Sequence, residues 1–316
     1  AKVSFTPLSV RPLPTRPWHV PGFGAAFWRS ARLCKKVIQQ QDIGAVVTMG
    51  GFVSGPAVWA ARRLGVPTLL VNLDAVPGKA NRWLGRWADH LFSCFEVAGL
   101  GPQVRSIGMP LRRSAMGSGN RDEDKKTLGL DPNRPLFLVT GASQGAASIN
   151  RWMIAMTQEP AFVEAAGTWQ ILHLAGADQA EAVDAAYRSA GLSAKVLEFC
   201  DRMGAAWGAA ELAVSRAGAG SAAEAAANAV PCLYLPYPFH KDQHQRLNVQ
   251  PLERAGAAVV ATDHVDPAQN QREIGPLLIE LLSDQARRLS MREALEARNT
   301  ADGAWVVAEE ALRLRV

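Results

Sequence analysis

Short apolar runs alternate along the chain with longer stretches in which apolar residues recur at helical spacing. The predicted strands cover residues 45–49, 67–72, 90–95, 136–140, 169–174, 194–199, 212–215, 232–237 and 257–261. These runs lack a strict apolar–polar alternation, which is typical of strands buried on both faces. The intervals between them mostly hold alanine-rich amphipathic helices. Alternation of this kind predicts an α/β protein whose parallel sheets are joined by right-handed crossovers.

The first helix is expected from about residue 24 to residue 40, after a proline-rich and irregular N-terminal stretch. One face of that helix carries Phe27, Ala31, Cys34 and Ile38. A polar, glycine-bearing and charged stretch at 104–126 is expected to be an interdomain linker. Because 316 residues are too many for one ordinary core, two domains are predicted.

The composition is that of a soluble globular enzyme, with 48% hydrophobic and 20% charged residues. No apolar run reaches the ~18 residues that span a bilayer. The four cysteines are scattered without a C-x-x-C motif, which argues against a zinc site or a disulfide framework and favours a reducing compartment.

The positive charge is concentrated at the N-terminal end. Residues 1–40 contain seven Lys and Arg and no Asp or Glu, and the whole chain carries a net charge of +5. The same segment holds Trp18, Phe23, Phe27 and Trp28. A basic and aromatic segment indicates an anionic membrane surface or a nucleic acid as partner, or else a solvated helix with a few core aromatics. No nucleic-acid recognition motif accompanies it, so that partner is disfavoured.

Three predicted strands end in loops of small residues that lead into a helix. These loops are 48–56, 140–150 and 215–225. Small residues let the backbone approach a phosphate, and a helix start offers free N–H groups and a positive dipole end. Packing in tight turns is the alternative for each loop alone. The loops match neither a dinucleotide fingerprint nor a Walker motif.

Two further segments leave a structural and a functional interpretation open. Ser221 and Glu224 form an S-x-x-E capping box, yet they follow a strand and a glycine turn that suit a nucleotide. The stretch 237–248 packs two His, a Lys, an Asp and two Gln, which either bond the hydroxyls of a sugar or form a polar surface loop. His173, on a predicted strand, is expected to be a core histidine.

These stretches together resemble the MurG family of bacterial peptidoglycan glycosyltransferases. The matching motifs, in the family's order, are GGFVSGP, GMPLR, TGASQGAASIN, EFCDRM, SRAGAGSAAE and PFHKDQHQRLN. The resemblance implies a GT-B fold, in which two Rossmann-like domains with parallel sheets face a cleft. It implies an acceptor and membrane-side domain at 1–105, a UDP-sugar-binding domain at 106–300 and a C-terminal helix at 301–316 that crosses back to the first domain.

The implied reaction is inverting transfer of N-acetylglucosamine (GlcNAc) from UDP-GlcNAc to undecaprenyl-pyrophosphoryl-MurNAc-pentapeptide (lipid I), which forms lipid II. The family works without a metal or cofactor at the cytoplasmic face of the inner membrane. For the donor phosphates, the resemblance implies contacts from Arg112, Ser143, Ala219, Gly220 and Ser221.

The rest of the donor is assigned by the same resemblance. The backbone of Cys200 meets the uracil edge, and Glu224 holds the ribose hydroxyls. His244 and Gln245 occupy the positions of the family's paired glutamines, which hold the sugar.

The acceptor side departs from the family. Gly50, Gly51 and Ser54 are expected to receive the acceptor pyrophosphate. The family's first strand and G-G-T-G-G-H loop have no counterpart here, so the N-terminal domain is expected to be incomplete and the chain a fragment. The histidine of that loop is one candidate base, and Asp74 is a weaker one.

The family's H-E-Q-N stretch reads Val71, Asn72, Leu73 and Asp74 in this chain. Three alternatives therefore stay open: another GT-B enzyme, such as a nucleotide-sugar 2-epimerase or a transferase with a different acceptor; a UDP-sugar-binding protein without activity; or half of a split transferase. Arg82, Trp83, Arg86 and Trp87 are expected either to assist membrane docking or, for the tryptophans, to pack in the core.

Overall fold

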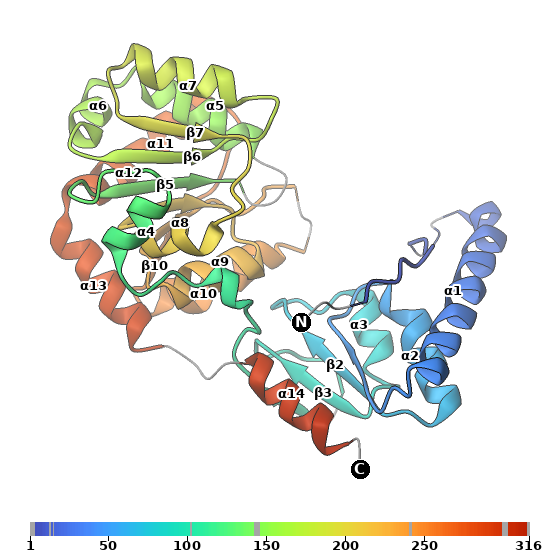
Figure 1. Cartoon of the computed structure of the whole chain (residues 1–316). Coiled ribbons are helices and arrows are strands. Elements are labelled where there is room, and N and C mark those ends of the chain that lie inside the picture. The colour runs from blue at the N-terminus through green and yellow to red at the C-terminus, as the bar shows by residue number, and fades with distance from the viewer. Residues whose placement is uncertain are drawn as a thin grey trace. The chain divides into compact units, whose positions relative to one another are not determined.

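A computed structural model describes residues 4–12, 14, 16–101, 103–141, 146–239, 242–298 and 303–314. The chain forms two compact units (Figure 1). Unit 1 comprises Ala1–Pro110 and Thr300–Val316, and unit 2 comprises Leu111–Asn299. The chain therefore leaves unit 1 and returns to it.

Unit 1 is built on a four-stranded parallel sheet in the order β1-β2-β3-β4. Its strands are β1 (Val46–Thr48), β2 (Thr68–Asn72), β3 (His90–Ser93) and β4 (Val104–Ser106). Its helices are η1 (Pro17–His19), α1 (Val20–Gln40), α2 (Ser54–Leu64), α3 (Lys79–Leu84) and α14 (Gly303–Arg313).

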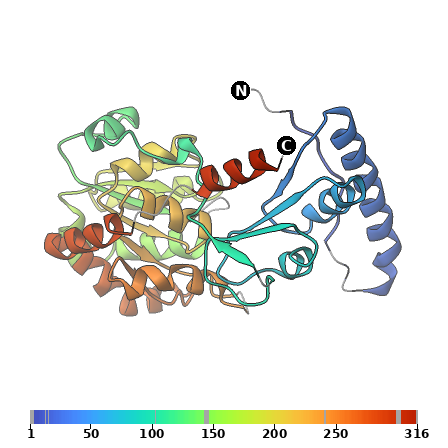
Figure 2. The same ribbon diagram turned by 90° about the horizontal axis from the view of Figure 1, so that it is seen from below.

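The core of unit 1 is divided into small clusters. The long helix α1 packs on α2, where Ile38 meets Ala60 and Ala61 (Figure 2). On the C-terminal helix α14, Val307 packs against Val71 of β2 and the buried residues around it. The sheet of unit 1 thus packs against a helix that follows unit 2 in the sequence.

Unit 2 holds a six-stranded parallel sheet in the order β10-β9-β8-β5-β6-β7. Its strands are β5 (Leu136–Thr140), β6 (Gln170–Leu174), β7 (Ala194–Leu197), β8 (Leu212–Ser215), β9 (Cys232–Tyr234) and β10 (Ala258–Val260). Its helices are η2 (Arg113–Ala115), α4 (Arg121–Thr127), α5 (Ala147–Met156), α6 (Pro160–Ala166), α7 (Ala180–Ser189), α8 (Met203–Ala209), α9 (Ala219–Ala227), α10 (His244–Arg254), α11 (Pro267–Glu273), α12 (Gly275–Ser283) and α13 (Gln285–Glu296).

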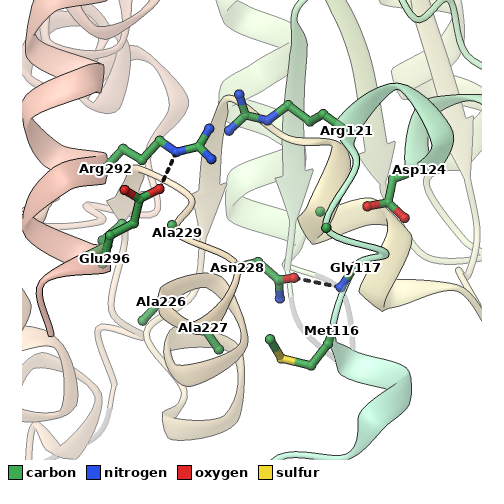
Figure 3. Close-up of a pocket in the computed structure, with 13 residues that line it drawn as sticks. Met116, Gly117, Arg121, Asp124, Ala226, Ala227, Asn228, Ala229, Arg292 and Glu296 are labelled. Carbon is green, nitrogen blue, oxygen red and sulfur yellow. Dashed lines mark hydrogen bonds and ion pairs between the residues drawn. The ribbon is translucent and has the colours of Figure 1, made fainter. Parts of the chain in front are cut away.

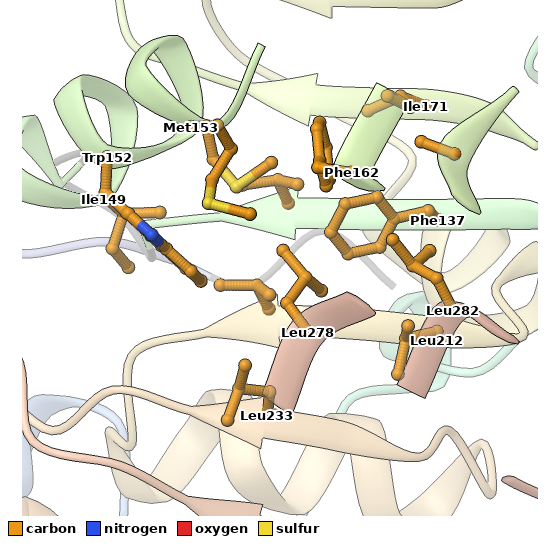
Figure 4. Close-up of a cluster of buried hydrophobic side chains, with 14 of the residues drawn as sticks. Phe137, Ile149, Trp152, Met153, Phe162, Ile171, Leu212, Leu233, Leu278 and Leu282 are labelled. Carbon is orange, nitrogen blue, oxygen red and sulfur yellow. The ribbon is translucent and has the colours of Figure 1, made fainter. Parts of the chain in front are cut away.

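Alternate residues of each central strand of unit 2 enter different cores. Phe137 of β5 packs among α5, α6 and α12, as Figure 4 shows with Phe162 and Leu278 near it. Its neighbour Leu138 faces the opposite cluster, which includes Trp207 of α8. Both faces of the sheet are covered by helices, so its strands appear in the sequence as continuous apolar runs.

All nine predicted strands are present, with ends that differ by up to three residues. The prediction of an irregular segment before residue 24 is partly wrong, because α1 begins at Val20 with Pro21 in its first turn, where a missing N–H is tolerated. The prediction of a linker over 104–126 is also wrong in part, because this stretch contains β4, η2 and the start of α4.

Candidate active site

The carboxyl ends of the unit 2 strands carry most of the predicted donor residues. Because all six strands are parallel, their carboxyl ends share one edge of the sheet, where open α/β sheets bind ligands. Cys200 follows β7, the 219–221 turn follows β8, and His244 follows β9. Ser143 follows β5 but lies outside the described residues.

The turn between β8 and α9 argues against the capping box, which was one of the two interpretations left open for Ser221 and Glu224. Gly218 is the N-cap in an extended conformation and has no side-chain cap, so Ser221 is the third residue of the helix. The first N–H groups of α9 therefore have no side-chain cap, and Gly220 between them is exposed. A helix start of this kind can bond phosphate oxygens through its backbone.

Glu224 lies one turn into α9 and is held by a neighbouring helix. Its Oε2 accepts a hydrogen bond of 3.0 Å from the indole Nε1 of Trp207 in α8. The carboxylate is half-buried, so one oxygen is fixed while the group still reaches solvent. Trp207 was not predicted as a site residue, because a tryptophan in an apolar helix is expected to serve the core.

A buried ion pair links the loops at this edge of unit 2. Arg216, directly after β8, lies 2.8 Å from Asp263 Oδ2, and both side chains are almost inaccessible to solvent. Arg216 also donates to Ser148 Oγ at the start of α5 (2.5 Å) and to Leu235 O after β9 (2.9 Å). One guanidinium therefore joins the segments after β5, β8, β9 and β10.

Asp263 is bonded well enough to stay ionised. Burial by itself would raise its pKa, but hydrogen bonds from Ser148, Asn270 and the Val265 N–H, together with the charge of Arg216, lower the pKa below its ordinary value. Single-sequence patterns gave no sign of this pair, because Arg216 and Asp263 meet only through the fold.

The loop after β9 positions the two residues predicted to hold the sugar. Gln245 Oε1 accepts from the Tyr237 N–H at 2.8 Å, which closes the loop on itself. His244 Nδ1 lies 2.8 Å from Asp242 Oδ1. Gln243, the N-cap of α10, has a left-handed backbone with φ 47°.

Cys200 and Arg112, two other predicted donor residues, each precede a helix, and these two helices pack on each other. The side chain of Cys200 is buried in the cluster that contains Leu138 and Trp207, among residues of α8 and α9. Burial there raises the pKa of its thiol. Arg112 is the exposed residue before η2, and η2 packs on α8 close to Gly204. η2, which follows Arg112, therefore packs on α8, which begins three residues after Cys200.

In unit 1, the glycine loop after β1 is held by an asparagine that no sequence motif indicates. The Gly51 N–H donates to Asn81 Oδ1 at 3.1 Å, and Ser54 Oγ donates to Gly50 O at 2.7 Å. Gly50 has φ 81° and leaves no room for a Cβ beside Asn81. Both features require glycine at this position.

The same network continues to Asp74. Asn81 Nδ2 donates to Asn72 Oδ1 at 3.0 Å, and Asn72 Nδ2 donates to the Asp74 carbonyl at 2.7 Å. The Asp74 carboxylate lies close enough to Cys94 to add to the effect of burial, and together they raise the pKa of that thiol to about 12. Gly50, Gly51 and Asp74 are therefore brought into one connected region.

In the described part of the chain, no three or more His, Cys, Asp or Glu side chains are grouped so that they could hold a metal ion. Nor does any helix in these ranges have both the length and the apolarity needed to cross a membrane.

Two Rossmann-like parallel sheets, with glycine turns at their carboxyl ends, are those of the GT-B fold. The model of the glycosyltransferase family 28 N-terminal domain matches residues 1–93, and that of the C-terminal domain matches residues 136–302. The chain belongs to glycosyltransferase family 28.

Among curated relatives, a Clavibacter sepedonicus protein is 37% identical over 303 residues, which cover 94% of this chain and 79% of the relative. It is named UDP-N-acetylglucosamine--N-acetylmuramyl-(pentapeptide) pyrophosphoryl-undecaprenol N-acetylglucosamine transferase.

Two solved structures show the same fold. The crystal structure of Acinetobacter baumannii MurG has a TM-score of 0.69 at 24% identity and covers 92% of this chain and 80% of that one. A putative UDP-N-acetylglucosamine 2-epimerase from Listeria monocytogenes has a TM-score of 0.65 at 14% identity, with 96% and 80% covered.

Proposed function

We propose that this protein transfers N-acetylglucosamine from UDP-GlcNAc to the undecaprenyl-pyrophosphoryl-MurNAc-pentapeptide acceptor, forming lipid II. The curated relative that spans most of the chain carries the name of this activity. The observation that carries the proposal in this chain is the β8–α9 turn. It offers uncapped N–H groups for a diphosphate and, one turn later, the half-buried carboxylate of Glu224 for ribose hydroxyls.

In the proposed reaction, an acceptor hydroxyl oxygen bonds to the anomeric carbon while the bond from that carbon to the diphosphate breaks. UDP leaves with the electron pair, and the hydroxyl proton passes to a base. Backbone N–H groups of residues 219–221 and the guanidinium of Arg112 balance the charge that develops on the diphosphate. Gly50, Gly51 and Ser54 receive the acceptor pyrophosphate, and Asp74 is the candidate base in this chain.

We propose that no metal ion takes part. Arg112 and the start of α9 supply the positive charge that a divalent cation would otherwise bring to the diphosphate. Turnover is therefore expected to be unchanged by EDTA, measured as UDP release before and after chelation.

The acceptor lipid stays in a bilayer, and unit 1 has a surface that suits an anionic one. On this surface Trp18, Val20 and Trp28 are half to two-thirds exposed. The exposed basic residues beside them on α1 are Arg29, Arg32, Lys35 and Lys36. Exposed tryptophans with basic neighbours bind interfacial regions of membranes without crossing them. Trp87 instead packs in the core, and only Trp83 of that pair is well exposed.

The experiment that tests the donor site is calorimetric titration with UDP-GlcNAc of the wild type, Glu224→Ala and Trp207→Phe. We expect Glu224→Ala to weaken binding at least tenfold, because it removes a charged hydrogen-bond acceptor. Trp207→Phe keeps the carboxylate but frees it from the indole, and a smaller loss is expected. Each variant's thermal unfolding is recorded as a check on folding.

Binding by Glu224→Ala as tight as by the wild type would refute the assigned role of this carboxylate. A donor that binds but is converted to its 2-epimer, with no transfer to the lipid acceptor, would instead identify an epimerase.

A further inference from the structure

Unit 2 contains a pocket that none of the donor or acceptor residues lines. It has a volume of about 380 Å³, within the range of small-molecule sites. Its walls come from the loop before α4, from α8, from the end of α9 and from α13 (Figure 3). Gly208 and Asn228 in these walls precede the amino ends of β8 and β9. The pocket therefore lies at the edge of the sheet opposite the donor loops.

Two guanidinium groups enter this pocket from different walls. Arg121 at the start of α4 and Arg292 of α13 extend toward each other in Figure 3. Burial lowers the pKa of Arg121, and the positive charge of Arg292 lowers it further, while the carboxylates of Glu211, Glu296 and Asp122 act in the opposite direction.

Within the described part of unit 2, some N–H groups of both guanidiniums have no hydrogen-bond acceptor. The nearest carboxylate oxygen to Arg121 is Glu211 Oε1, at 4.0 Å, which is too long for a hydrogen bond. That carboxylate is already occupied by Lys125 Nζ at 2.9 Å and by the Leu136 N–H. Arg292 is bonded only through Nε, to Glu296 Oε1 at 2.8 Å. Its terminal nitrogens are left to face the pocket.

The acidic groups of the pocket do not fill the space between the arginines. Both oxygens of Asp124 accept from the Ser118 N–H, and this carboxylate is buried against Gly117 and Gly208. Glu296 is on α13 itself, one turn from Arg292. The rest of the lining is small or apolar and leaves room for an organic body, with Ala226, Ala227 and Leu295 among its members.

We propose that this pocket binds a small phosphate-bearing molecule, with the phosphate between the guanidinium groups of Arg121 and Arg292. Planar guanidiniums bond phosphate oxygens in pairs, and two of them match the double negative charge of a phosphate monoester. The site is separate from the donor site and does not depend on the proposed transfer reaction.

The test is calorimetric titration of the full chain with glucose 1-phosphate and, separately, with inorganic phosphate, at constant ionic strength. We expect Arg121→Ala and Arg292→Ala each to weaken binding at least tenfold. Glu296→Gln removes a carboxylate that competes for Arg292, and it is expected to strengthen binding severalfold. Arg188→Ala is the matched control, since Arg188 forms an exposed i,i+4 pair with Asp184 in the same unit.

The two titrants distinguish the source of the phosphate. Tighter binding of glucose 1-phosphate indicates a phosphorylated metabolite, and equal affinity indicates free phosphate. The proposal is overturned if neither titrant binds, or if the arginine variants bind as the wild type does while thermal unfolding shows them folded. It is also overturned if Glu224→Ala abolishes binding, because the ligand would then occupy the donor site.

Discussion

Both units are parallel sheets packed against helices, but they differ greatly in how many apolar side chains they bury. In unit 2, both faces of a six-stranded sheet are covered by helices, and Trp152 and Trp207 are fully buried on opposite sides. In unit 1, the four-stranded sheet has small separate clusters, and even β1 leaves Val47 41% exposed. Unit 2 therefore has the rigid frame that the proposed donor site needs. Unit 1 instead keeps apolar and basic side chains exposed, which suits the proposed contact with the acceptor's membrane.

The largest expected effect concerns the ion pair that joins the loops of unit 2. Arg216→Ala leaves Asp263 buried and unpaired, and we expect it to destabilise unit 2 by about 3–5 kcal/mol. Arg188→Ala, in an exposed pair of the same unit, should cost no more than about 0.5 kcal/mol. Hydrogen exchange measured for individual peptides shows whether the destabilisation is in unit 2 or in unit 1. Equal effects of the two substitutions would contradict the view that this pair holds the loops.

The next effect is a pH dependence confined to unit 2. His173 is buried between Tyr187 Oη (2.9 Å) and Asn150 Oδ1 (3.0 Å), and burial lowers its pKa to about 3. Asn150 Nδ2 donates elsewhere, so its oxygen accepts from His173 Nε2–H, and the neutral ring accepts from the tyrosine.

Between the ordinary pKa of about 6.5 and the folded value of about 3, the unfolded chain binds a proton that the folded chain does not. The stability of unit 2 should therefore fall as the pH falls below 6.5, by roughly 1.4 kcal/mol per pH unit. Denaturant unfolding at several pH values measures this slope. His173→Gln should flatten it, and an unchanged slope would show that other groups cause the acid sensitivity.

A smaller effect is expected in unit 1. Asn81→Ala removes the acceptor of the Gly51 N–H and the donor to Asn72, and it should cost about 1–3 kcal/mol. Exchange protection should drop in the 50–54 loop while UDP-GlcNAc binding by unit 2 stays the same. Asn133→Ala is a suitable control, because the recorded hydrogen bond of Asn133 comes from its backbone N–H. Loss of donor binding in Asn81→Ala would contradict the view that unit 2 binds the donor independently of the unit 1 loop.

The smallest effect on stability is expected at the exposed tryptophans of unit 1. Trp18→Ala should change the free energy of unfolding by no more than about 0.5 kcal/mol, because this side chain is 67% exposed. Sedimentation with phosphatidylglycerol vesicles should nevertheless show weaker binding, and salt should weaken the wild type too. Trp305→Ala, 71% exposed on α14, is the control. Equal losses in both variants would argue against a specific membrane surface on η1 and α1.

The sequence predicted the buried strands because two-sided burial leaves an unbroken apolar run, as in residues 136–140. It missed β4, whose Val104, Arg105 and Ser106 form an edge strand that is partly or fully exposed. The confirmed prediction for His173 also came from its place on such a strand.

The site was predictable only where local pattern determines it. The glycine turn before α9 was visible, but whether Ser221 caps the helix depends on where the helix begins, and the extended Gly218 takes the cap position. The contacts of Arg216 with Asp263 and of Gly51 with Asn81 join residues far apart in sequence. Such pairs leave no periodic signal in a single chain.

The passage of the chain out of unit 1 and back again has a consequence for biosynthesis. During translation, unit 2 can complete its contiguous segment, Leu111–Asn299, as soon as that segment has emerged from the ribosome. The sheet of unit 1 is synthesised before unit 2, whereas Val307 and the rest of α14 are synthesised after it. During synthesis, part of the apolar face of the unit 1 sheet therefore stays uncovered until α14 has left the ribosome.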